Sequence, residues 1–169
     1  ARIVFESNRD GVRNLWVMAP DGTGVRQLTS LDGAATLASV GRDARGATIV
    51  TFDANRENDL YRSPRPYRIP IDGGTIERVI DAFGTRTNFS PDGTRVLFDR
   101  GGASWSRRGY RGPDARDLWV LDLRDGSYRQ LTGWHGNDGS GHWAHDGSII
   151  YLSDEHDGVV NVMRPAADA

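Results

Sequence analysis

The feature that most limits how this chain can fold is a tight Asp-Gly turn that recurs at a nearly constant spacing. Asp21-Gly22, Asp72-Gly73 and Asp125-Gly126 each follow an aromatic residue by five or six positions, and they are 51 and 53 residues apart. A second series, Asp92-Gly93 and Asp146-Gly147, has a spacing of 54 residues. Two independent series with almost one period indicate an internal repeat of slightly more than 50 residues.

Each repeat is made of short apolar runs that alternate with period two. Examples are RVLF (95–98), LWVLDL (118–123) and IIYL (149–152), and no apolar series at helical spacing persists along the chain. The repeat therefore predicts a four-stranded antiparallel meander: strand a before an SPDG-type turn, b after it, c ending at the next Asp-Gly, and d ending in Leu-Thr. We expect type I′ geometry at the Asp-Gly turns, because both central positions of that turn need positive φ. Meanders repeated at this spacing are blades of a β-propeller, so the predicted fold class is all-β.

Aligning the repeats predicts a single β-propeller segment of about four blades, with units at about 1–30, 31–82, 83–133 and 134–169. The first unit lacks strand a, and the last ends at a c–d turn at Asp168 and lacks strand d, which gives 14 strands in all. The a–b turn of the second unit, GRDARG (41–46), departs from the SPDG pattern. We expect further segments of a longer chain, or further subunits, to complete the ring by contacting residues 2–6 and 158–164.

Composition excludes several classes of function. A formal net charge of -2 gives no basic footprint for nucleic acid, and no apolar run approaches the roughly 20 residues of a membrane span. There are no cysteines, and all 21 Lys+Arg residues are arginine, which excludes thiol and lysine chemistry. The compartment is not fixed by these features; a periplasmic or secreted location is favoured over a cytoplasmic one.

Several stretches resemble known propeller families. SNRDGVRNLWVM (7–18), SPDG (90–93) and RQLT (26–29 and 129–132) resemble PD40 repeats, which occur in TolB, in prolyl-oligopeptidase relatives and in tricorn-type proteases. ENDLYRSPRPYRIPIDGG (57–74), SWSRRGYRGPDARDLWVLDL (104–123) and GNDGSGHWAHDGSIIYLSDEHDGVVNV (136–162) look like the N-terminal propeller of tricorn-like peptidases of the S41 class.

The resemblance implies a non-catalytic propeller that controls peptide access to, or docking on, a serine peptidase whose catalytic region lies elsewhere. No G-x-S-x-G elbow is present, and we expect no catalytic residue, cofactor or metal on this chain. One alternative is a TolB-type interaction propeller, which the reading frame after residue 169 would distinguish. A metal-dependent propeller lyase is a further alternative, which metal analysis of the purified chain would test.

The best candidate for a binding site is a long insertion, GGASWSRRGYRGPDAR (101–116), between strands b and c of the third unit. Its arginine and aromatic side chains suit recognition of a peptide or a carboxylate. The candidate peptide-binding residues are Trp105, Arg107, Arg108, Tyr110 and Arg111. The alternative is a loop that packs over the rim of its own blade and leaves its arginines in water. A second insertion, ANRENDLYRSPRPYR (54–68), falls at the same b–c position, so both are expected on one face, where loops on a rigid scaffold place binding residues.

Histidines and Asp-Gly pairs are the two patterns that could supply metal ligands. His142 and His145 straddle the end of a strand and its turn, which favours diverging rings over shared coordination with His135 and His156. The Asp-Gly pairs could supply calcium ligands, but they lack the D-x-D-x-D spacing of a dedicated loop, so turn chemistry is favoured. Trp16, Tyr67 and Trp119, which recur at one place in strand c, are expected to lie in the core between blades.

Overall fold

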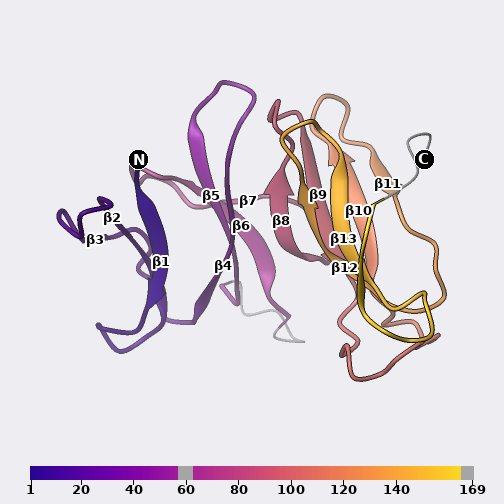
Figure 1. Ribbon diagram of the computed structural model, residues 1–169. Coiled ribbons are helices and arrows are strands. Elements are labelled where there is room, and N and C mark those ends of the chain that lie inside the picture. Colours follow the sequence, from indigo (N-terminus) through magenta and orange to yellow (C-terminus); the bar gives the residue numbers. More distant parts are fainter. Residues whose placement is uncertain (57–62, 165–169) are drawn as a thin grey trace.

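The computed structural model describes residues 1–56 and 63–164 and shows four antiparallel sheets that follow one another in chain order (Figure 1). We call them the first sheet (β1-β2-β3), the second (β4-β5-β6-β7), the third (β8-β9-β10-β11) and the fourth (β12-β13-β14). Their strands are β1 (Ile3–Ser7), β2 (Asn14–Met18), β3 (Arg26–Gln27), β4 (Ala35–Arg42), β5 (Thr48–Ala54), β6 (Arg65–Pro70), β7 (Glu77–Arg78), β8 (Thr85–Phe89), β9 (Arg95–Arg100), β10 (Asp117–Asp122), β11 (Tyr128–Gln130), β12 (Asp138–Trp143), β13 (Ile149–Ser153) and β14 (Asn161–Met163).

This architecture confirms the all-β class and a partial propeller with three, four, four and three strands in its sheets. Residues 2–6 fall largely in β1 and residues 158–164 include β14, and among the described residues each of these strands is hydrogen-bonded to a strand on one side only. Their contact with protein outside this chain stays a prediction. The c–d turn expected at Asp168 lies outside the described residues. Within the described part, no helix is long and apolar enough to cross a membrane.

Three apolar clusters hold the sheets together, one between each pair of successive sheets. On β9, Val96 and Phe98 pack toward the second sheet, while Leu97 between them packs toward the fourth. The same alternation places Val50 and Phe52 of β5 in the cluster shared with the first sheet. Because successive side chains of a strand point to opposite faces, the period-two pattern supplies apolar groups to both sides of each inner sheet.

Two of the three recurrent aromatics of strand c pack between successive sheets, and the third does not. Tyr67 is fully buried in the cluster between the first and second sheets, and Trp119 packs against the cluster between the second and third. Both confirm the expected position between blades. Trp16 is buried but lies on the opposite face of β2 from Leu15 and Val17, which pack toward the second sheet. The guanidinium of Arg9 covers its ring at 4.7 Å.

The turns form where the Asp-Gly pairs predict them, but their geometry is not type I′. At 90–93, the Gly93 amide donates to the Ser90 carbonyl at 2.8 Å, and Gly93 has φ 70°. Asp92 is not among the residues with positive φ, and the same holds for the aspartates before Gly22, Gly73, Gly126 and Gly147. The type I′ expectation was therefore wrong for all five turns: the aspartate lies in the turn itself, and a left-handed glycine follows it. Consecutive positive φ values occur at Gly73 and Gly74 (92° and 137°) and at Asp157 and Gly158 (56° and 65°).

Four of the five turn aspartates, Asp21, Asp92, Asp125 and Asp146, also accept a hydrogen bond from the backbone amide two residues on, which favours this residue type before the glycine. Asp92 accepts from the Ser90 hydroxyl at 2.6 Å and from the Thr94 amide at 3.1 Å. These bonds, led by the one from Ser90, lower the pKa of Asp92 to about 2. The degenerate turn at 41–46 uses the same device, since Asp43 accepts from the Arg45 and Ala47 amides. Turn chemistry thus accounts for these carboxylates.

Candidate functional site

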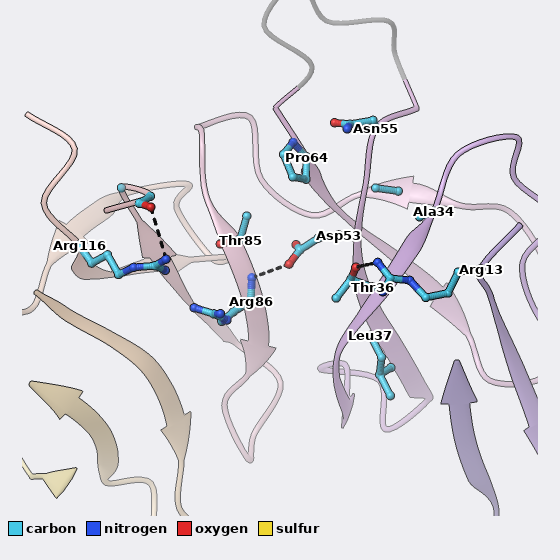
Figure 2. Close-up of a pocket in the computed structure, with 13 residues that line it drawn as sticks. Arg13, Ala34, Thr36, Leu37, Asp53, Asn55, Pro64, Thr85, Arg86 and Arg116 are labelled. Atoms are coloured by element: carbon cyan, nitrogen blue, oxygen red, sulfur yellow. Dashed lines mark hydrogen bonds between the residues drawn. The ribbon is translucent and has the colours of Figure 1, made fainter. Parts of the chain in front are cut away.

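The connections between strands b and c of the first three sheets meet around one pocket of about 490 Å³ (Figure 2). Arg13 comes from the connection in the first sheet, Asn55 and Pro64 from that in the second, and Gly101 and Gly102 from the insertion of the third. The two insertions therefore begin on the same side of the molecule, as the sequence predicted. Residues 57–62 of the second insertion lie outside the described residues.

One contact repeats between successive sheets and contributes Leu37, Asp53 and Arg86 to the pocket lining. The carboxylate next to the end of the b strand in each of the first three sheets accepts a hydrogen bond from a backbone amide in strand a of the following sheet. The three contacts are Glu6 Oε1 to the Leu37 amide at 2.7 Å, Asp53 Oδ2 to the Arg86 amide at 3.0 Å, and Asp99 Oδ2 to the Ser140 amide at 2.8 Å. We call these contacts the carboxylate clips. They satisfy amides in strands that leave the regular ladder, and so fix the position of each sheet against the next.

The clips coincide with irregular backbone. The ladders between strands a and b shift register at Leu37/Ser39, Thr85/Asn88 and Gly139/His142. Arg86 and Ser140 have φ values of 56° and 54°, in the left-handed region that side chains other than glycine rarely adopt. The bulge turns the amide of each toward the carboxylate of the preceding sheet. Backbone conformations of this kind persist only where the surroundings hold them, and the clip supplies that restraint.

Two arginines lie side by side on one wall of the pocket. Arg86 Nη1 is 3.2 Å and Arg116 Nη1 is 3.9 Å from the same oxygen, Asp99 Oδ2. Asp99 is almost completely buried, whereas the side chain of Arg86, which lines the pocket, is 46% exposed. Burial, followed by the charge of Arg86, lowers the pKa of Arg116 below that of an ordinary guanidinium. On the opposite wall, Arg13 donates to the Thr36 hydroxyl at 2.9 Å.

Asp53 lies between these walls and is the most perturbed carboxyl group of the site (Figure 2). It is 8% exposed. Burial raises its pKa to about 6, and the hydrogen bond from the Arg86 amide offsets only part of this effect. Its second oxygen, Oδ1, is buried and has no hydrogen-bond partner among the described residues. The site therefore combines donor-rich arginines with a carboxylate oxygen that lacks a donor.

The raised pKa of Asp53 predicts a specific dependence of stability on pH. The folded state binds a proton more tightly than the unfolded state, so between about pH 4 and pH 6 the free energy of unfolding should fall as the pH rises. The shift corresponds to a loss on the order of 3 kcal/mol above pH 6. Asp53→Asn should remove this slope, because the amide does not titrate and its oxygen can still accept from the Arg86 amide. Urea unfolding of both proteins at pH 4.5 and 6.5 measures the effect; parallel pH profiles would show that another group is responsible.

The insertion at 101–116 is an ordered loop that docks on the fourth sheet. Its base is closed by the Gly102 and Ala103 amides, which donate to the Asp114 carbonyl at 3.2 and 2.9 Å. Its tip is held by Asp154, whose Oδ2 accepts from the Gly109 amide at 2.9 Å. Asn137 Nδ2 also donates to the Arg107 carbonyl at 3.1 Å. The loop therefore packs against the following sheet and not only over the rim of its own blade, while Arg107, Arg108 and Arg111 remain exposed, as the packing alternative expected.

Asp154 is the anchor of this arrangement. It is fully buried and also accepts hydrogen bonds from the Asn137 amide at 2.8 Å and from Trp134 Nε1 at 2.9 Å. Burial alone would raise the pKa of its carboxyl group, but the hydrogen bonds from Asn137, Trp134 and Gly109 outweigh it and lower the pKa. Asp154 is thus ionised at neutral pH and ties together three segments.

The five candidate peptide-binding residues lie on this loop and do not line the pocket. Arg107, Arg108 and Arg111 are exposed, and Trp105 and Tyr110 are partly buried. The guanidinium of Arg107 stacks on the Tyr110 ring at 3.8 Å, and that of Arg116 is 5.9 Å from the Trp105 ring. The Arg108 side chain approaches Gly158 on the fourth sheet. Through Arg116, the loop and the pocket are neighbouring parts of one face.

Sequence reasoning did not identify Asp53, Asp99 and Arg86. A signal for the carboxylates was present, because an acidic residue follows the aromatic near the end of the first three b strands: Phe5-Glu6, Phe52-Asp53 and Phe98-Asp99. Arg86 carried no such signal, since its role depends on a bulge. The four histidines, His135, His142, His145 and His156, are all exposed. Within residues 1–56 and 63–164, no group of three or more histidine and acidic side chains is placed to hold a metal ion.

Solved structures with similar folds include the tricorn protease, with a TM-score of 0.72, 18% identity and 99% of this chain covered. A putative TolB from Agrobacterium tumefaciens gives a TM-score of 0.61 with 17% identity over 98% of this chain. An uncharacterized protein of Agrobacterium fabrum is 27% identical over 108 residues, which are 58% of this chain and 36% of that protein. The chain spans 55% of the TolB chain and 16% of the tricorn protease chain.

The match that identifies the family covers almost all of the sequence. The model of the tricorn protease N-terminal beta propeller domain matches residues 1–168. This agrees with the PD40 and tricorn-like stretches found in the sequence and with the four successive antiparallel sheets. The chain therefore belongs to the family of tricorn protease N-terminal β-propeller domains.

Proposed function

We propose that this chain is a non-catalytic propeller segment that docks peptides for a tricorn-like serine peptidase. The proposal rests chiefly on one observation: a buried carboxylate, Asp154, holds the insertion in place while Arg107, Arg108 and Arg111 remain exposed. An ordered loop with exposed arginine donors binds a carboxylate or an acidic peptide without a large entropic cost. The adjacent open pocket on the same face gives such a peptide room to continue.

The arrangement of the whole protein is part of this proposal. The four units at 1–30, 31–82, 83–133 and 134–169 act as one propeller segment, and the ring is completed by other segments of a longer chain or by further subunits. The chain spans 16% of the tricorn protease chain and 55% of the TolB chain, which supports this view. A TolB-type interaction propeller is the second candidate, favoured by the structural likeness to a putative TolB.

Replacing Arg107, Arg108 and Arg111 together by alanine should abolish peptide binding and leave the melting temperature nearly unchanged. The three side chains are exposed, so their removal takes away donors for the ligand while the anchor at Asp154 remains. Titration of a fluorescent peptide with a free carboxyl terminus measures binding, and a thermal melt measures stability. A matched control replaces Arg42, Arg45 and Arg129, which are also exposed, and has the same change in net charge. A large fall in melting temperature would show that the loop arginines serve packing.

A further inference from the structure

The pocket between the first three sheets presents two complementary groups to a ligand. Arg86 and Arg116 approach one oxygen of Asp99, and the hydrogen bonds found in the described chain use only part of the five N–H donors on each guanidinium. Arg86 lines the pocket, and its side chain is 46% exposed. Planar guanidinium groups with unused donors bind carboxylates in two-point geometry, which makes this wall an anion-binding surface.

The second group is the carboxylate of Asp53, which needs a hydrogen-bond donor. Its Oδ2 accepts from the Arg86 amide, but its buried Oδ1 has no donor among the described residues. A buried acceptor without a partner is costly, and in native proteins such an atom is almost always satisfied by a ligand, water or another group. Because Asp53 lines the pocket (Figure 2), a ligand in the pocket can supply this donor.

A peptide with an acidic side chain carries an anion and a hydrogen-bond donor a short distance apart, as the two pocket groups require. Its carboxylate is an anion, and its own backbone N–H groups are donors. The rest of the lining combines two polar side chains, Arg13 and Asn55, with small, apolar or hydroxylic residues: Ala34, Thr36, Leu37, Ala54, Pro64, Thr85, Gly101 and Gly102. A volume of about 490 Å³ is within the range of small-ligand sites and suits a short stretch of chain.

We propose that this pocket binds an acidic side chain of a docked peptide, with its carboxylate on Arg86 and Arg116 and a backbone N–H of the peptide on Asp53. The proposal rests on the peptide-docking function proposed above and deepens it. It assigns a preference for an aspartate or glutamate within the peptide to the pocket residues and not to the loop arginines. The carboxylate clip between Asp53 and the Arg86 amide sets the spacing of the two ligand groups.

The test uses two pentapeptides, both N-acetylated and C-terminally amidated, with a central glutamate or a central glutamine among alanines. Blocking both ends removes the terminal charges, so the difference between the peptides reports only on the side-chain carboxylate. Isothermal titration of the 169-residue chain should show binding of the glutamate peptide about tenfold or more tighter than the glutamine peptide. Equal affinities, or no binding of either peptide to a folded chain, would overturn the proposal.

Three variants assign the effect to the pocket. Arg86→Asn should abolish the preference for glutamate, and asparagine tolerates the left-handed backbone at this position. Arg86→Lys keeps the charge and should retain part of the preference. Asp53→Asn should weaken both peptides about equally, because its one oxygen is used by the Arg86 amide and the NH2 group that replaces Oδ1 cannot accept a peptide N–H. Melting temperatures establish that each variant is folded, and a preference that survives in folded Arg86→Asn would also overturn the proposal.

The same titrations separate this proposal from the peptide-docking function. If the pocket assignment alone is wrong, the two blocked peptides bind equally, while binding of a peptide with a free carboxyl terminus still depends on Arg107, Arg108 and Arg111. If the loop assignment alone is wrong, the triple alanine variant binds that peptide normally and the preference for glutamate persists. The two failures are thus distinguishable.

Discussion

Gly93→Ala is expected to destabilise the fold by more than about 3 kcal/mol, which exceeds the cost of a glycine replacement in an open turn. A Cβ atom at Gly93 would lie 2.3 Å from the carbonyl carbon of Asp43 and 2.5 Å from the amide nitrogen of Ala44. Both are backbone atoms of the corresponding turn in the preceding sheet, so they cannot rotate aside as a side chain could. The substitution therefore forces the second and third sheets apart at this end.

The matched control is Gly147→Ala, at the same turn position one sheet later. Gly147 has φ 81°, close to the 70° of Gly93, but a Cβ atom there meets nothing within 4 Å. Its replacement should cost only the backbone strain of a left-handed alanine, about 1–2 kcal/mol. Urea unfolding of both variants measures the difference. Equal losses of stability would mean that the close approach of the two turns contributes nothing.

Asp154→Ala should release the insertion loop and destabilise the chain by about 3–5 kcal/mol. The carboxylate accepts from the Asn137 amide and side chain, from Trp134 Nε1 and from the Gly109 amide, and alanine would leave these donors unsatisfied. Limited digestion with trypsin reports on the loop, since Arg107, Arg108 and Arg111 are cleavage sites within it. Cleavage there should become much faster than in the wild-type chain.

Glu155→Ala provides the control, because Glu155 is the exposed neighbour of Asp154 and its loss should leave both stability and cleavage unchanged. The lowered pKa of Asp154 adds a pH dependence. Its contribution is complete above the ordinary aspartate value of 3.8 and is lost as the pH falls through the lower folded value. If the loop of Asp154→Ala resists trypsin as well as the wild type does, the anchor must lie elsewhere.

The sequence alone was sufficient to determine the repeat, the number of strands and the position of the turns. A period-two pattern as in RVLF (95–98) can bury alternate side chains only as a strand between two packed layers. An aspartate before glycine marks a turn because its carboxylate accepts a hydrogen bond from the backbone amide two residues on, and because glycine readily adopts positive φ. These are local properties, readable from a few neighbouring residues. The exact turn type was not readable, since Asp92 could occupy either of two turn geometries and the hydrogen bond from Ser90 to Asp92 belongs to the one observed.

Only the tertiary structure showed which residues come together at the candidate site. The bulge that turns the Arg86 amide toward Asp53 exists because two sheets meet there, and no property of the segment around Arg86 requires a left-handed arginine. The docking of the insertion on Asp154 joins residues 45 positions apart. Contacts of this kind depend on the packing of whole sheets, and the energies of burial and of unsatisfied polar groups that select them have no local signature in the sequence.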